Sequence, residues 1–121
     1  MGLKITVTKS FYFDYAHHLP DYDGKCSNMH GHRGEIQVTF NKCPKEKQKP
    51  GMVIDFYDIK KVIEPIVEQL DHAYLNNLIE NPTAENMLTW FYDQVQNTEL
   101  RFCIEKIRIY ETPDNFAELT I

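Results

Sequence analysis

The chain has 121 residues, of which 42% are apolar and 12% aromatic, enough for one folded domain over residues 1–121 but too few for two cores. Its formal net charge of -5 argues against a nucleic-acid-binding surface, although a small anionic substrate could still bind in a locally basic pocket. No apolar run approaches the roughly 20 residues of a membrane span, and no signal peptide is evident at the start, so we expect no membrane partner. The three cysteines are few and odd in number. We therefore expect a cytoplasmic protein without a disulfide framework.

The first expected element is a long, half-buried strand over residues 3–17. Apolar and aromatic side chains occupy most of its odd positions, whereas its even positions are mostly polar. This period of two indicates one buried face, which places His17 on that face and His18 on the other. Residues 19–27 are rich in proline, aspartate and glycine and predict a loop.

A second strand is expected from about residue 32 to residue 40, with its apolar side chains at even positions. His30 and His32 share that parity. Because side chains two residues apart on an extended chain point to the same side, His17, His30 and His32 can all face the buried side of two paired strands.

Residues 42–51 are charged and contain two prolines, which predicts a surface loop. A helix should follow, with Asp55 as its N-cap and apolar residues three and four apart as far as Leu70. Pro65 lies inside this pattern, so we expect a bend there.

A second helix is expected after a cap at Asn81 or Thr83, with Pro82 in its first turn. Two further strands, over residues 101–111 and 116–121, complete the chain. The order ββααββ predicts an α+β fold, a four-stranded antiparallel sheet with two helices on one face.

Three histidines on one face predict a metal site, and zinc is the usual occupant of such sites. Three neutral imidazoles would leave a fourth position open for water or substrate, as in catalytic zinc sites. Cys26 lies four residues before His30. It is either a fourth ligand, which would close a structural site, or a base or nucleophile whose pKa the metal lowers.

Three more residues carry candidate chemistry. Asp71 could orient the imidazole of His72 for acid/base work, or the two could simply end the first helix. Glu111 continues an apolar strand face, so it is either an exposed strand end or a carboxylate that accepts hydrogen bonds from two adjacent N–H groups of a ligand.

Motifs spread over nearly the whole chain resemble the 6-pyruvoyl-tetrahydropterin synthase superfamily. They are His17, Cys26-x3-His30-Gly31-His32, Asp55-Phe56, Leu70-Asp71-His72, Asn81-Pro82-Thr83-Ala84-Glu85-Asn86 and Glu111-Thr112. The three-residue gap between the cysteine and His-Gly-His looks like the 6-carboxytetrahydropterin synthase branch of the queuosine pathway, since the pyruvoyl-forming branch usually has a longer gap.

The resemblance implies a tunnelling fold, in which a homo-oligomer built from trimers, as in a hexamer, joins its sheets and forms active sites between subunits. It implies a pterin triphosphate substrate, 7,8-dihydroneopterin triphosphate, converted to 6-carboxy-5,6,7,8-tetrahydropterin with loss of acetaldehyde and triphosphate. By the same resemblance, the three histidines would bind zinc, Cys26 would be the base, Asp71 and His72 the second acid/base unit, and Glu111 the pterin anchor.

The sequence departs from the family at Arg33-Gly34, where members more often have a hydroxyl or aromatic residue. Arg33, Lys25 or the basic loop over residues 42–49 could meet the triphosphate, although a solvated loop is the simpler interpretation. Two rival functions stay open: a 6-pyruvoyl-tetrahydropterin synthase, and a non-catalytic zinc- or pterin-binding module with Cys26 as fourth ligand.

Overall fold

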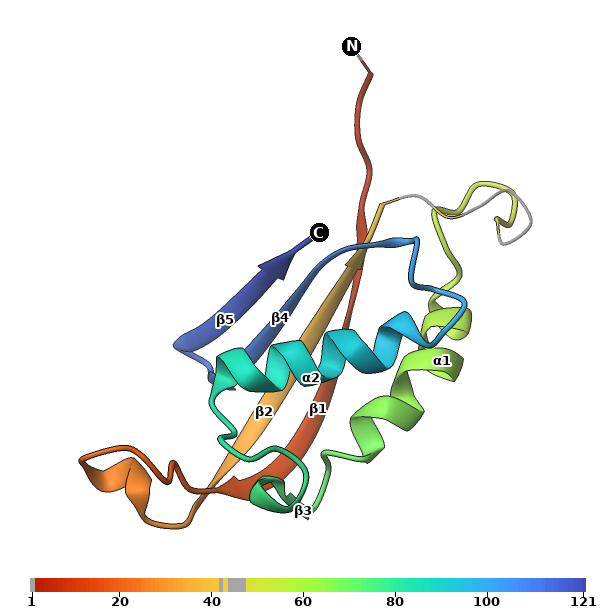
Figure 1. Ribbon diagram of the computed structural model, residues 1–121. Helices are drawn as coiled ribbons and strands as arrows, with labels where there is room; N and C mark the ends of the chain where they lie inside the picture. The colour runs from red at the N-terminus through yellow and green to blue at the C-terminus, as the bar shows by residue number, and fades with distance from the viewer. Residues whose placement is uncertain (1, 42, 44–47) are drawn as a thin grey trace.

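The computed structural model describes residues 2–41, 43 and 48–121, which form a twisted sheet with two helices packed on one face (Figure 1). The elements are, in chain order, β1 (Val7–His17), β2 (His30–Phe40), α1 (Phe56–Glu68), β3 (Ala73–Tyr74), α2 (Ala84–Gln96), β4 (Ile104–Thr112) and β5 (Asn115–Thr120). The strands lie in the order β3-β1-β2-β4-β5. Neighbouring strands are antiparallel, except for the short parallel pair of β1 with β3.

The α+β class is therefore confirmed, although the described part of the chain has five strands where four were expected. The additional strand, β3, pairs only through Ala73 and Tyr74 with the end of β1. Two residues are too few to show a period of two, so the sequence carried no signal for it.

The core lies between the sheet and the helices and follows the predicted parity. Phe13 of β1, Ile36 and Val38 of β2 and Ile107 of β4 are almost fully buried. The predicted strand start at residue 3 was wrong: β1 begins at Val7, because its partner strand β2 ends opposite that residue. The preceding segment projects past the end of the sheet (Figure 1).

Both helix caps use side-chain oxygens. Asp55 accepts a hydrogen bond from the backbone N–H of Tyr57, as expected of the N-cap of α1, and Pro65 lies inside that helix. Thr83 accepts from the backbone N–H of Asn86 and caps α2. Pro82 therefore precedes the cap and does not lie in the first turn, where it was expected.

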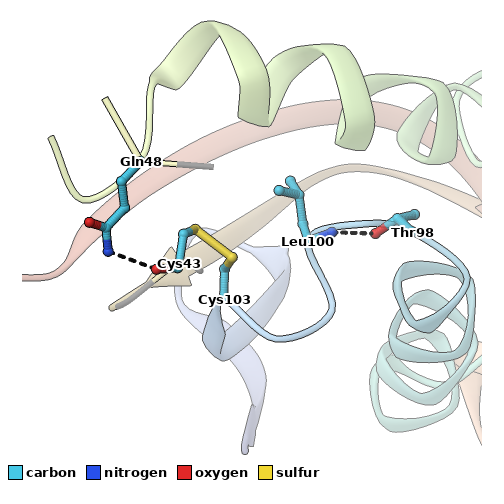
Figure 2. Close-up of a disulfide and its surroundings, with 5 residues drawn as sticks. All are labelled: Cys43, Gln48, Thr98, Leu100 and Cys103. Atoms are coloured by element: carbon cyan, nitrogen blue, oxygen red, sulfur yellow. Dashed lines mark hydrogen bonds between the residues drawn. A yellow bond between two sulfur atoms is a disulfide. The ribbon is translucent and has the colours of Figure 1, made fainter. Parts of the chain in front are cut away.

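Cys43 and Cys103 form a disulfide between the chain that leaves β2 and the chain that enters β4 (Figure 2). The expectation of no disulfide was therefore wrong, because the cysteine count does not show that these two positions meet in the fold. Both cysteine side chains are buried, whereas the neighbouring Phe102 is 71% exposed. Residue 102 is therefore not part of the buried strand that was predicted over residues 101–111. None of the helices in the described ranges is long and apolar enough to span a membrane.

Candidate metal centre and active site

Three histidines meet at the end of the sheet beside the loop over residues 19–29. His17 is the last residue of β1, and the strand register pairs it with His30, the first residue of β2. His32 follows two residues later on the same face of β2. His17 is only 1% exposed. The convergence that the strand parity predicted is thus present in the structure.

Backbone carbonyls determine which nitrogen of two imidazoles carries the proton. The Nδ1 atom of His17 lies 2.8 Å from the carbonyl oxygen of Pro82, and that of His30 lies 2.7 Å from the carbonyl oxygen of Asn28. A carbonyl can only accept, so both Nδ1 atoms donate, and in the neutral rings both Nε2 atoms carry lone pairs. These two Nε2 atoms lie 3.0 Å apart.

Two lone pairs repel each other at that distance unless a positive charge lies between them. The Nε2 atom of His32 is also buried and has no directed hydrogen bond, although the carboxylate oxygen of Glu111 lies 3.0 Å away. The ligand atoms of His17, His30, His32 and Glu111 all lie within 4.8 Å of one another. Tetrahedral zinc would hold its nitrogen ligands roughly 3.3 Å apart, so these residues fit such an ion.

The charges in this cluster also suit a cation. Burial lowers the pKa of His32, more than the nearby carboxylate raises it, and favours the neutral ring that binds metals. Contact with His17 lowers the pKa of Glu111, and the other two histidines lower it further. Glu111 is therefore ionised at neutral pH and directed into the cluster rather than exposed at the strand end.

Cys26 lies outside this group of ligands. It sits on the 3-10 turn Lys25–Ser27, half-buried and with a free thiol. The fourth ligand atom of the cluster belongs to Glu111, not to Cys26.

Asp71 and His72 form a second cluster with Asp14. The Nδ1 atom of His72 lies 2.9 Å from an Asp71 carboxylate oxygen, whose partner oxygen accepts the backbone N–H of Asp14 at 2.8 Å. That backbone hydrogen bond is the largest of the effects that lower the pKa of Asp71. The His72 side chain is 80% exposed and its φ of 56° is in the left-handed region.

The two clusters do not meet within one chain. Asp14 points to the face of β1 opposite to Tyr15 and His17, because neighbouring residues of a strand alternate. The four-residue cluster of histidines and Glu111 shares no member with the cluster of Asp14, Asp71 and His72. His72 therefore has its ring free to contact another molecule.

Sequence reasoning missed Tyr15 as a member of the site. Its ring stacks on Phe13, stands edge-on to His17 with centroids 5.1 Å apart, and lies 5.5 Å from the ring of His32. Burial raises the pKa of the Tyr15 phenol, and the negative charge of Glu111 raises it further. The only sequence signal was its parity, which it shares with ordinary core residues.

Two of the candidate phosphate contacts are paired with carboxylates. Arg33 lies 3.4 Å from the carboxylate of Asp14 and over the ring of Tyr12, at the rim of a 390 Å³ cavity that reaches Glu111. Lys49 is paired with the carboxylates of Asp55 and Asp58. Most of the basic loop over residues 42–49 lies outside the described residues.

Comparisons with known proteins agree with this geometry. Residues 6–120 match the family described as 6-pyruvoyl tetrahydropterin synthase. A 6-carboxy-5,6,7,8-tetrahydropterin synthase of Haemophilus influenzae is 31% identical over 93% of this chain and 96% of its own length. Another, of Synechocystis sp., is 37% identical over 74% of both chains. The solved structure of Caenorhabditis elegans 6-pyruvoyl tetrahydropterin synthase has a TM-score of 0.83 at 24% identity and covers 97% of this chain, with 95% of that chain covered.

Proposed function

Because the chain belongs to the 6-pyruvoyl tetrahydropterin synthase family, we propose that it is a zinc-dependent 6-carboxy-5,6,7,8-tetrahydropterin synthase. The reaction converts 7,8-dihydroneopterin triphosphate to 6-carboxytetrahydropterin, acetaldehyde and triphosphate, as a step of queuosine (7-deazaguanine) biosynthesis. The observation that carries the proposal is the convergence of three histidines and Glu111 in a chain with the short Cys26-x3-His30 gap. The relatives named for the carboxy product, 31–37% identical, support this branch.

His17, His30 and His32 would hold the zinc, with two imidazoles oriented by the backbone carbonyls described above. Bound there, zinc would polarise the side-chain oxygens of the substrate and acidify the neighbouring C–H groups. Glu111, ionised at neutral pH, would accept the amino and ring N–H groups of the pterin and so place its side chain at the histidines.

Cys26 would remove the proton from the substrate side chain. Asp71 and His72 would form the second acid/base unit, in which the carboxylate orients the imidazole and stabilises its charged form. Because this pair and the histidines form separate clusters within one chain, we propose that it serves the site of a neighbouring subunit in a homo-oligomer built from trimers.

The first experiment is to incubate the zinc-loaded protein with 7,8-dihydroneopterin triphosphate and to identify the products by mass. Carboxytetrahydropterin together with acetaldehyde is the expected result. If the product is pyruvoyl-tetrahydropterin, the proposed site stands but the protein belongs to the pyruvoyl-forming branch. Absence of turnover, together with loss of metal in Cys26→Ala, would indicate a binding module instead.

The variant Cys26→Ala is expected to keep its zinc and lose turnover, measured by metal analysis and product formation. The shared site can be tested by mixing Cys26→Ala with His72→Ala after dissociation and reassociation. If each site takes residues from two subunits, the mixture regains a fraction of wild-type activity that neither variant has alone. A mixture that stays inactive would contradict the shared site.

A further inference from the structure

The hydroxyl group of Tyr15 is a buried hydrogen-bond donor without a partner among the described residues. The residue is 4% exposed, and its hydroxyl oxygen is shielded from solvent and makes no hydrogen bond to any residue that the structure describes. Burying a polar group without a partner costs free energy, and a phenylalanine ring would fill the same space without that cost. A core with no other function would therefore favour Phe at position 15.

The position of the ring suggests what the hydroxyl is for. Tyr15 lies two residues before His17 on the same face of β1, and the register places it directly opposite His32. Its ring contacts the imidazoles of both histidines. In the part of the chain that the structure describes, one other buried side-chain polar atom has no directed partner, Nε2 of His32, and it belongs to the same site. Two such atoms in one place indicate a site that is completed by a ligand.

A glycine on the neighbouring strand gives the ring its space. Gly34 of β2 is buried, and a Cβ atom built there would lie 3.0 Å from Cε1 of Tyr15 and 2.7 Å from Cζ of Phe13. The aromatic pair thus packs directly onto the backbone of β2. A larger residue at position 34 would displace the rings and, with them, the hydroxyl group.

The remaining groups of the site leave a role for a donor. The carboxylate of Glu111 can only accept hydrogen bonds, and the Nε2 atoms of the histidines point at the proposed metal. A pterin ring presents N–H donors beside acceptor atoms, namely a carbonyl oxygen and ring nitrogens. Glu111 satisfies the donors, and the neutral phenol of Tyr15 can satisfy an acceptor.

We propose that Tyr15 is a substrate-binding residue, whose hydroxyl donates a hydrogen bond to an acceptor atom of the pterin ring held by Glu111. The proposal rests on the proposed function, which supplies the pterin. It adds a contact that depends on the Tyr15 and Gly34 of this chain. In the free protein the hydroxyl makes no hydrogen bond to any described residue, and the bound pterin would supply its partner.

The test compares Tyr15→Phe with the wild type and with Tyr57→Phe, an exposed tyrosine of α1 that serves as matched control. Binding of unsubstituted pterin to the zinc-loaded proteins is followed by pterin fluorescence, and unfolding by urea and zinc content are measured alongside. Tyr15→Phe is expected to raise the Kd for pterin roughly 3- to 10-fold, the effect of one neutral hydrogen bond. Its zinc content and stability should equal or exceed those of the wild type.

Each other result has a distinct meaning. An unchanged Kd in Tyr15→Phe, with pterin still bound by the wild type, would overturn the role of the hydroxyl and leave the proposed function intact. A clear loss of stability would show that the hydroxyl has a partner within the protein, and would also overturn it. A wild type that binds no pterin would instead refute the proposed function.

Discussion

The substitution Gly34→Ala tests how tightly the aromatic pair packs on β2. The added Cβ would lie 2.7 and 2.8 Å from two ring carbons of Phe13 and 3.0 Å from one of Tyr15. Contacts below 3.0 Å force atoms to move, and Phe13 is only 1% exposed, so its ring has nowhere to go without disturbing the core. Such overpacking typically costs about 1–3 kcal/mol.

Part of this cost is offset, because replacing glycine restricts the unfolded chain and stabilises a protein by about 0.4–1 kcal/mol. We therefore expect a net loss of about 1–2 kcal/mol. For 121 residues the entropy of unfolding is about 0.25 kcal/mol per kelvin, so Tm should fall by about 4–8 °C.

Thermal and urea unfolding of the metal-free protein measure this effect without a contribution from zinc binding. The matched control is Gly31→Ala on the same strand, whose added Cβ would meet only the backbone oxygen of Tyr15, at an ordinary 3.4 Å. This variant should be as stable as the wild type or slightly more stable. A second variant, Phe13→Leu combined with Gly34→Ala, should show a favourable coupling of about 0.5–3 kcal/mol, because the smaller side chain gives the new Cβ room. If Gly34→Ala and Gly31→Ala unfold alike, the rings do not pack on β2 as described, and the account of Tyr15 loses its support.

Three further outcomes are expected. The disulfide between Cys43 and Cys103 closes a span of 60 residues, so the free energy of unfolding measured in urea should be about 4 kcal/mol larger for the oxidised protein than for the reduced one. The denatured oxidised chain should titrate one thiol instead of three. Because burial lowers the pKa of His32, the unfolded metal-free chain binds more protons than the native one. The free energy of unfolding of the metal-free protein should therefore fall as the pH drops below about 6.5. The fall should be shallower in His32→Asn. Thr83→Ala removes the N-cap of α2 and should cost about 1 kcal/mol, measured by urea unfolding.

The convergence of the three histidines could be predicted because a strand has a strict period of two. His17, His30 and His32 share the parity of their apolar neighbours, and one fixed pairing of β1 with β2 is enough to bring them together. The N-cap of α1 at Asp55 was equally predictable, since it depends on residues within one turn, whereas for α2 the sequence left Asn81 and Thr83 both open.

The features that the sequence did not predict depend on three-dimensional neighbours. Tyr15 is an aromatic residue at a core-facing position of β1, like ordinary core residues. It differs from them in that its hydroxyl makes no hydrogen bond to any described residue. Cys43 and Cys103 meet because β2 ends where β4 begins, which a count of cysteines cannot show. β3 is too short to have a pattern of its own.

The Asp71–His72 pair and the histidines form two separate clusters within one chain. The backbone N–H of Asp14 holds the Asp71 carboxylate beside β1, where the chain leads into β3, and the Asp71–His72 pair and the histidine cluster share no member. If both act on one substrate molecule, as proposed, the exposed imidazole of His72 would reach the histidines of another copy. The activity of mixed Cys26→Ala and His72→Ala subunits therefore tests whether one site takes residues from two subunits.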